Sequence, residues 1–345
     1  MTMLLWLAEL TGASFLLSYG AEHLSMRYGA KFVGRTLLSV ATTLPEIAIV
    51  VYAAAAGAYE VAIGAGLGSN LLMMTLGLAI MLLIATTRLS KAPLKGVDVT
   101  TFKLDKIFLI ATALVSLVLF IDGYSYYDGF IFAGMFGAYL VVALVEMKAE
   151  NRANKAKKQV VEDHKVVSFS EGNSAHGKKM GGKMTKAVLA FAAGTAGIFL
   201  GAEPFIHSLE GYSVEAGVSV IVLAVIISPI AGEMPEKISM MLLARKGAAG
   251  ASIAVANVLG SKILNNTLLL AVAVFGAMYY AGFFAVIQST PALQFQIILV
   301  TVVTLIAIAL MFKKAMGLKE GIILAAMYVV SIIIQFLLPQ DPTAH

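Results

Sequence analysis

A proline-glutamate pair occurs twice inside long apolar segments, and this repeat constrains the possible fold more than any other feature. Pro45-Glu46 interrupts an apolar run over 32–56, and Pro235-Glu236 repeats the pair 190 positions later within 214–244. A carboxylate inside a bilayer is costly, so by default it marks an ion or proton site. A membrane proline also frees backbone carbonyls of the preceding turn, which adds oxygen atoms of the kind that hard cations prefer.

The apolar segments are long enough to cross a membrane. The 345 residues are 59% hydrophobic and 13% charged, and the mean hydropathy is +0.89, which excludes an ordinary soluble domain. The chain has no cysteine, so disulfides and thiolate metal sites are excluded. Since roughly 20 apolar residues span a bilayer, we expect an all-α membrane protein with ten transmembrane helices. The expected spans are about 3–24, 32–56, 61–87, 107–122, 128–147, 187–209, 214–244, 250–279, 292–312 and 320–338.

The basic residues predict the topology. All Lys and Arg residues except Lys237 and Lys262 fall in alternate loops of the ten-span arrangement, so they share one side of the membrane. The opposite loops carry acids and no Lys or Arg: Glu60, Asp122, Asp128, Glu210 and Glu215. The positive-inside rule then predicts a multi-pass protein of the cell membrane, with both termini outside and residues 148–186 in the cytoplasm.

The basic loop 148–186 divides the chain into two five-span halves, 1–147 and 187–345. We interpret this loop as a connector, with a possible regulatory role through anionic lipid. An odd number of spans in each half turns the second half upside down, which predicts inverted-topology repeats with a site where they meet. Further matched landmarks support the repeat: Gly20-Ala21-Glu22 with Gly201-Ala202-Glu203, and Gly68-Ser69-Asn70 with Gly260-Ser261-Lys262.

These motifs resemble the two α-repeats of the calcium/cation antiporter superfamily. The first is Thr42-Thr43-Leu44-Pro45-Glu46 followed by Gly68-Ser69-Asn70, and the second is Met234-Pro235-Glu236 followed by Gly260-Ser261. The resemblance implies that Glu46 and Glu236 face each other across a central cavity and coordinate Ca²⁺. It implies Thr42 and Thr43 as hydroxyl or carbonyl ligands, with Ser69 and Ser261 beside them. It also implies alternating access, in which the first and sixth spans slide over the core.

The second repeat departs from the sodium/calcium branch. Gly232 and Glu233 stand where that branch has a hydroxyl pair, and Lys262 stands where Asn is usual. Asn265 keeps the amide usual four residues after the repeat serine, whereas the first repeat has Met73 there. We therefore expect Asn265 among the cation-binding residues.

Three further charged residues lie near the expected site. Glu233 could be a third ligand, a proton carrier or the partner of a lysine. Lys262, if it reaches the cavity, could occupy a place where other family members bind a monovalent cation, which would disfavour sodium coupling and favour protons. Lys237 could snorkel or pair with Glu233.

The sequence therefore predicts an antiporter that exchanges a divalent cation, Ca²⁺ before others, for H⁺. Without the divalent ion Glu46 and Glu236 repel each other, so protons could replace it. Na⁺/Ca²⁺ exchange and antiport of another cation (Mg²⁺, or Na⁺ against H⁺) stay open. Lipid and transported cations are the expected partners, with no nucleic acid and no permanently bound cofactor. An intramembrane enzyme is disfavoured because the five histidines are scattered and form no His-Glu-x-x-His motif.

Overall fold

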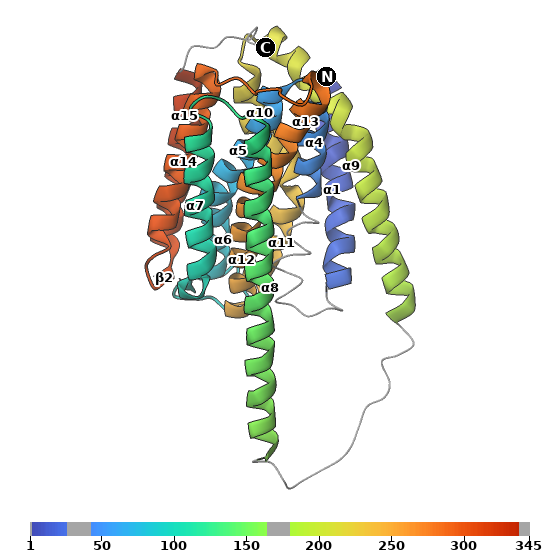
Figure 1. The fold of residues 1–345 in the computed structure, drawn as a ribbon. Coiled ribbons are helices and arrows are strands. Elements are labelled where there is room, and N and C mark those ends of the chain that lie inside the picture. The colour runs from blue at the N-terminus through green and yellow to red at the C-terminus, as the bar shows by residue number, and fades with distance from the viewer. Residues whose placement is uncertain (1, 26–42, 164–179, 338–345) are drawn as a thin grey trace.

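The computed structural model describes residues 2–25, 43–163 and 180–337, which form a helical bundle (Figure 1). The helices of the first half are α1 (Thr2–Ser25), α4 (Leu44–Ala55), α5 (Tyr59–Leu72), the π-helix η2 (Met73–Gly77), α6 (Leu78–Thr86), the 3₁₀-helix η3 (Thr100–Phe102), α7 (Lys103–Leu119) and α8 (Tyr126–Asp163). Those of the second half are α9 (Met180–Ala216), α10 (Val220–Gly232), α11 (Met234–Ala244), α12 (Ala248–Leu264), the π-helix η4 (Asn265–Leu269), α13 (Leu270–Ala281), α14 (Pro291–Leu310) and α15 (Leu318–Leu337).

Several helices are long and apolar enough to cross a membrane. Within the described residues there are six of them, Tyr59–Thr86, Tyr126–Glu146, Met184–Ala216, Ala248–Ala281, Pro291–Leu310 and Leu318–Leu337. Shorter apolar helices cover Thr2–Leu17, Leu44–Ala55 and Val220–Ile230. A multi-pass membrane protein follows, while the count of ten crossings stays a prediction.

Three expected boundaries differ from the structure. Helix α8 continues to Asp163 and α9 already begins at Met180, so both reach into the expected connector 148–186. Helix α9 also runs to Ala216, beyond the expected end at 209. Gly217 ends it with a φ of +64°, and the backbone N–H of Val218 donates to the carbonyl of Ser213. A glycine in this left-handed conformation stops a helix, and it moves the turn to 217–219.

The two Pro-Glu pairs begin helices after matching breaks. Thr43 precedes α4 with φ −89° and ψ −2°, and Glu233 precedes α11 with φ −86° and ψ 0°. Each carbonyl accepts the N–H four residues later, from Ile47 and Lys237. Proline fits the first turn of a helix because its missing N–H would have no partner there. The long segment expected at 214–244 is therefore broken at Glu233.

A polar layer lies between two apolar clusters of buried residues. One cluster includes Leu71 of α5 and Leu264 of α12. The other includes Met73 of η2 and Ile263 of α12. The chain passes from one cluster to the other at these points in both halves. The buried polar residues next to them, Ser69 in α5 and Ser261 in α12, thus lie at mid-height in the bundle.

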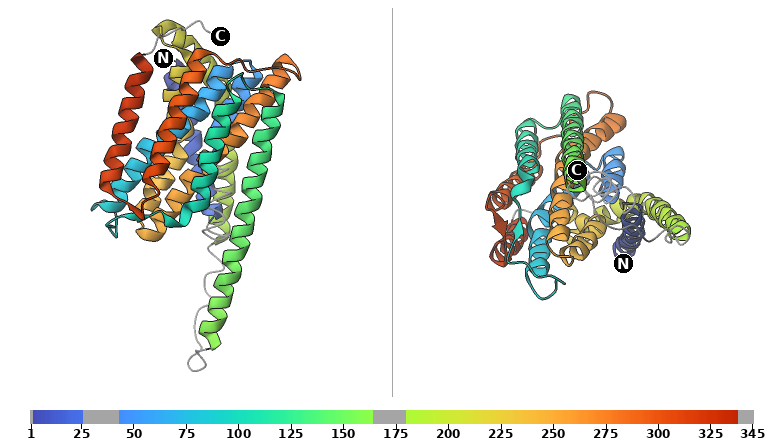
Figure 2. Two further views of the ribbon diagram at one scale, coloured as in Figure 1. Left: turned by 60° about the vertical axis from the view of Figure 1, so that its left-hand side comes forward. Right: turned by 90° about the horizontal axis from the view of Figure 1, so that it is seen from below.

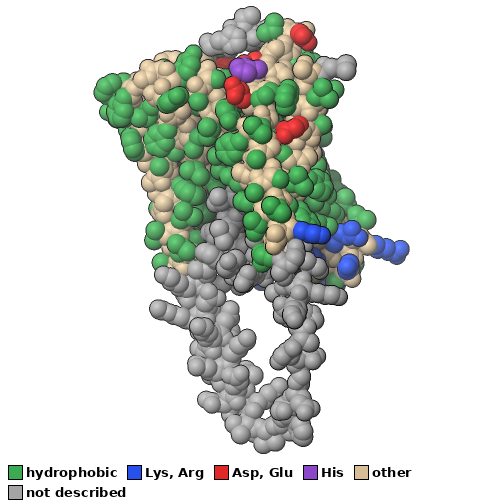
Figure 3. All heavy atoms as spheres, turned by 90° about the vertical axis from the view of Figure 1, so that its right-hand side faces the viewer, with side chains coloured by type: hydrophobic (Ala, Val, Ile, Leu, Met, Phe, Trp, Pro, Cys, Tyr) green, Lys and Arg blue, Asp and Glu red, His purple; other side chains and the backbone are tan. Residues whose placement is uncertain are grey.

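Helices α1 and α9 pack mainly on each other at one edge of the bundle, as the view from below shows (Figure 2). At the lower end, β1 (Val97–Asp98) pairs antiparallel with β2 (Ala315–Met316) and joins the two halves. Lys and Arg side chains gather near this end, and acidic side chains near the other (Figure 3). The start of α1 and the end of α15 lie at the acidic end, and α8 projects beyond the basic end (Figure 1).

Candidate functional site

Two buried carboxylates occupy equivalent places at the starts of α4 and α11. Glu46 is 2% exposed and Glu236 is 1% exposed, each in the first turn of its helix. Helix N-termini carry a partial positive charge that favours a carboxylate there. Within the described residues, one oxygen of each side chain, Oε2 of Glu46 and Oε1 of Glu236, has no hydrogen-bond partner. Both oxygens are therefore available to a cation or a proton.

A third carboxylate and a lysine lie beside them. Glu233 and Lys262 are fully buried, and the Lys262 ammonium donates to Oε1 of Glu233. The same ammonium donates to Ser69 Oγ at 2.7 Å and lies 3.8 Å from Oε2 of Glu236. Glu46 interacts electrostatically with Glu233, Lys262 and Glu236, so the three carboxylates share one charged environment.

Hydroxyl and amide groups from both halves complete this group. Ser261 Oγ donates to Oε2 of Glu236 at 2.9 Å, and Ser69 Oγ donates to Oε1 of Glu233. Asn265 Nδ2 donates to Ser69 Oγ at 2.6 Å, while its Oδ1 is buried with no partner among the described residues. We call these seven residues the polar cluster: Glu46, Ser69, Glu233, Glu236, Ser261, Lys262 and Asn265.

The structure thus brings most of the predicted site residues together. Thr43 is 1% exposed and caps α4, three residues before Glu46. Thr42 lies outside the described residues. Of the two possibilities for Lys237, the ion pair with Glu233 is not formed in the described structure; the Lys237 ammonium donates to the carbonyl of Pro229 at 3.0 Å. The lysine that pairs with Glu233 is Lys262.

Two further positions do not follow from the repeat motifs. A Cβ on Gly232 would lie 3.1 Å from Cδ of Glu46, so this glycine makes room for the carboxylate. A glycine in the turn before a carboxylate is a sequence signal of such close packing. Ser228, in α10, is 2% exposed, and its Oγ has no partner among the described residues.

The polar cluster is not a closed metal cage. Among the described residues, no three His, Cys, Asp or Glu side chains are arranged to hold a metal ion. One Glu233 oxygen is instead engaged by the Lys262 ammonium, which also bonds Ser69. Glu46 and Glu236, with hydroxyl and amide neighbours, form an open set of oxygen ligands. Such a set is suited to reversible binding of a hard cation.

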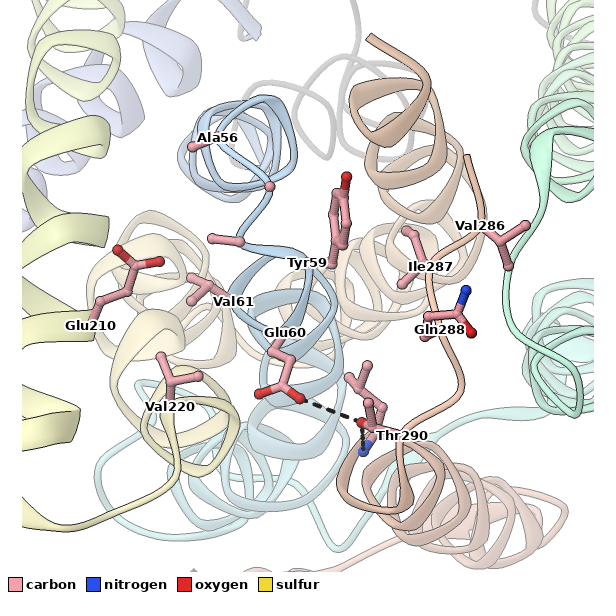
Figure 4. Close-up of a pocket in the computed structure, with 13 residues that line it drawn as sticks. Ala56, Tyr59, Glu60, Val61, Glu210, Val220, Val286, Ile287, Gln288 and Thr290 are labelled. Carbon is pink, nitrogen blue, oxygen red and sulfur yellow. Dashed lines mark hydrogen bonds between the residues drawn. The ribbon is translucent and has the colours of Figure 1, made fainter. Parts of the chain in front are cut away.

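A separate pocket of about 390 Å³ opens at the acidic end between the α4–α5 turn, the end of α9 and the loop before α14 (Figure 4). Glu60 and Glu210 project from its walls, and Thr290 Oγ1 donates to Oε1 of Glu60 at 3.4 Å. No residue of the polar cluster lines this pocket. It is therefore distinct from the mid-height site.

Comparisons with known proteins give the family and the fold. A family model described as sodium/calcium exchanger protein matches residues 1–145 and 186–337. An uncharacterized membrane protein of Methanocaldococcus jannaschii is 23% identical over 315 residues, 91% of this chain and 90% of the relative. The H⁺/Ca²⁺ exchanger CAX superposes with a TM-score of 0.74 at 20% identity, covering 98% of this chain and 81% of that one. The sodium-calcium exchanger NCX_Mj gives 0.62 at 19% identity, covering 96% of each chain. The two structural likenesses show a shared fold.

Proposed function

The chain belongs to the sodium/calcium exchanger protein family, and on this premise we propose that it exchanges Ca²⁺ for H⁺ by alternating access. The observation that carries the proposal is the pair of buried carboxylates, Glu46 and Glu236, each with one oxygen free of partners among the described residues. Two carboxylates neutralise one divalent ion, and hard oxygen ligands suit Ca²⁺. We propose that the neutral ligands, or the groups that support the carboxylates, are Ser69, Ser261, Thr43, Thr42 and Asn265.

Protons are proposed as the counter-ion because the same carboxylates can take them up when Ca²⁺ leaves. Two negative charges close together repel each other without a cation, and protonation removes that repulsion. Na⁺ is disfavoured because Lys262 already fills part of the cluster with positive charge. Na⁺/Ca²⁺ exchange is the second candidate, since the structure of a sodium-calcium exchanger superposes over 96% of the chain.

The membrane arrangement proposed for this function is two inverted repeats, 1–147 and 187–345. The matching breaks at Thr43 and Glu233 support it, as do the π-helices η2 and η4, whose starts are 192 positions apart. The gathering of Lys and Arg near one end supports a cytoplasmic location for that end and for the connector 148–186 (Figure 3). Both termini are then proposed to lie outside the cell membrane.

Ca²⁺ flux in proteoliposomes tests the proposal, with pH and Na⁺ gradients imposed separately. We expect a pH gradient alone to drive Ca²⁺ flux. Glu46→Gln and Glu236→Gln should each reduce it by roughly 100-fold or more, because each removes one of the two charges that neutralise the divalent ion. A buried charge that loses its partner costs about 3–5 kcal/mol, and 1.4 kcal/mol is a factor of ten. Glu320→Gln is the matched control, since that carboxylate pairs with Lys313 outside the cluster.

Each contrary result has a distinct meaning. Flux that requires a Na⁺ gradient would replace the counter-ion and favour the second candidate. Mg²⁺ flux without Ca²⁺ flux, or Na⁺/H⁺ exchange alone, would replace the cargo. Glu46→Gln with undiminished Ca²⁺ flux would overturn the proposed site.

A further inference from the structure

The Lys262 ammonium lies in a cage of oxygen atoms. Its three oxygen neighbours are Ser69 Oγ at 2.7 Å, Oε1 of Glu233 in a hydrogen-bonded ion pair, and Oε2 of Glu236 at 3.8 Å. The side chain has 0% exposure. A carboxylate, a hydroxyl and a second carboxylate are the surroundings that a small monovalent cation would take in a dry site.

The charge balance of the cluster depends on this ammonium. Within the seven residues of the polar cluster, Glu46, Glu233 and Glu236 carry three formal negative charges, and Lys262 reduces the sum to two. That sum matches one divalent cation. Lys237 lies outside the cluster, bonded to the Pro229 carbonyl, and acts on the three carboxylates from there. Without Lys262 the three carboxylates would bury one more negative charge, which is costly unless another cation compensates it.

The equivalent position in the first half shows that the helix does not need a lysine there. Asn70 follows Ser69 as Lys262 follows Ser261, and Nδ2 of Asn70 donates to Oδ1 of Asn266. A neutral amide is thus compatible with this place in the fold. A buried lysine is a costly alternative, and its contacts with Ser69 and Glu233 indicate what offsets that cost.

We propose that Lys262 is a tethered monovalent cation, which fills a subsite bounded by Ser69, Glu233 and Glu236 and thereby leaves the site one divalent ion to bind. The significance of this inference rests on the proposed antiport, whereas the test of it does not require transport activity. Replacing Lys262 by the residue of the other half, Lys262→Asn, empties the subsite and leaves its oxygen atoms in place. A free Na⁺ or methylammonium ion should then bind there.

The primary test is thermal stability of the purified full-length protein in detergent at constant ionic strength, with Na⁺ or methylammonium replacing choline. A ligand that binds only the folded state stabilises it by RT ln(1 + [L]/Kd), so the melting temperature rises with the ligand concentration. We expect Lys262→Asn to melt lower than wild type in choline, and to rise by several degrees in Na⁺ or methylammonium. Wild type should show no such rise in methylammonium.

Two controls separate the subsite from a general effect of lost charge. Lys237→Asn removes the other membrane lysine, whose ammonium bonds the Pro229 carbonyl, and should gain no dependence on Na⁺. Lys262→Asn combined with Glu233→Gln restores the formal charge of the cluster and should lose most of the dependence. The chain has no cysteine, so Lys262→Cys treated with an aminoethylating thiol reagent should replace the ammonium and remove the dependence again.

The inference is overturned if Lys262→Asn responds to Na⁺ and methylammonium no more than Lys237→Asn does. It is also overturned if methylammonium stabilises wild type, because this ion mimics the Lys262 ammonium and is the counter-ion of neither candidate exchange; this arm needs no variant to fold. The flux assay distinguishes the two proposals. Wild type without Ca²⁺ flux, together with a Na⁺-stabilised Lys262→Asn, would keep the tethered cation and reject Ca²⁺ exchange.

Discussion

At the residue scale, the two repeat serines have unequal roles. Ser69 Oγ contacts three side chains, accepting from Lys262 at 2.7 Å and from Asn265 at 2.6 Å and donating to Glu233. Ser261 Oγ has one such contact in the cluster, to Glu236 at 2.9 Å. The two halves meet at Ser69, because its three partners all belong to the second half: Lys262 lies in α12, Asn265 in η4, and Glu233 between α10 and α11.

This asymmetry predicts that Ser69→Ala is more damaging than Ser261→Ala. Each buried donor or acceptor left without a partner costs about 1–3 kcal/mol, and Ser69→Ala leaves more of them. We expect Ser69→Ala to lower Ca²⁺ flux roughly tenfold more than Ser261→Ala, at equal protein levels. Equal losses, measured in the same proteoliposome assay, would mean that both serines act only as ligands of the ion.

The sequence predicts these residues because polar residues are rare inside apolar segments, and here they recur in the same order in both halves. Glu46, Glu236, Ser69 and Ser261 follow from that repeat, and the structure places them in one cluster. Which lysine enters the cluster could not be predicted, because Glu233 ends one helix and caps the next. The break turns Lys237 toward the Pro229 carbonyl, and Lys262 reaches Glu233 from α12. Only the three-dimensional packing of α11 on α12 decides between the two.

At the element scale, a close contact between α5 and α10 positions Ser69. A Cβ on Gly68 would lie 2.1 Å from the carbonyl oxygen of Val225, so the two backbones approach as near as glycine allows. Helix α5 carries Ser69 next in sequence, and α10 ends at the break that presents Glu233. The contact therefore sets the distance between the halves at the site.

Gly68→Ala should consequently separate α5 from α10 and impair the site. Overpacking costs about 1–3 kcal/mol, and here the neighbour is backbone, which cannot turn aside. We expect a lower melting temperature and a loss of Ca²⁺ flux. Gly66→Ala is the matched control, because its Cβ would lie 3.8 Å from Leu269 Cδ2 in ordinary contact and the helix propensity gain is the same. If both variants behave alike, the α5–α10 approach does not control the site.

Element boundaries show where sequence patterns lose their force. The apolar pattern predicts the positions of the helices well, since burial and lipid contact require it over each whole segment. The turn at 217–219 depends on Gly217. The acidic residues Glu210 and Glu215 do not mark it, because both lie inside helix α9. Charged residues at a helix end do not stop the helix, whereas a left-handed glycine does.

At the scale of the whole molecule, α1 and α9 form a pair at one edge of the bundle (Figure 2). Their contact is tight: a Cβ on Gly194 would lie 2.4 Å from the backbone nitrogen of Leu17, and one on Gly20 would lie 2.6 Å from the carbonyl oxygen of Ala187. Contacts with the core include Tyr52 of α4 against Phe199 of α9, edge to face at 6.5 Å between ring centroids. Side-chain contacts of this kind can slide more readily than interlocked backbones, so the pair is suited to move as one body.

Reversible crosslinking tests this motion, because the chain has no cysteine of its own. Ala13→Cys with Gly197→Cys links α1 to α9, where a Cβ on Gly197 would lie 2.9 Å from that of Ala13. A disulfide needs about 3.8 Å between Cβ atoms, so a small adjustment suffices. If the two helices move together, Ca²⁺ flux should survive this link. Tyr52→Cys with Phe199→Cys, joined by a short cleavable thiol reagent, ties α9 to the core and should stop flux until a reductant restores it.

Two results would contradict this motion. Flux that persists through the link between α9 and the core would show that the site opens by another motion. Flux lost through the link between α1 and α9 would show that these two helices move relative to each other.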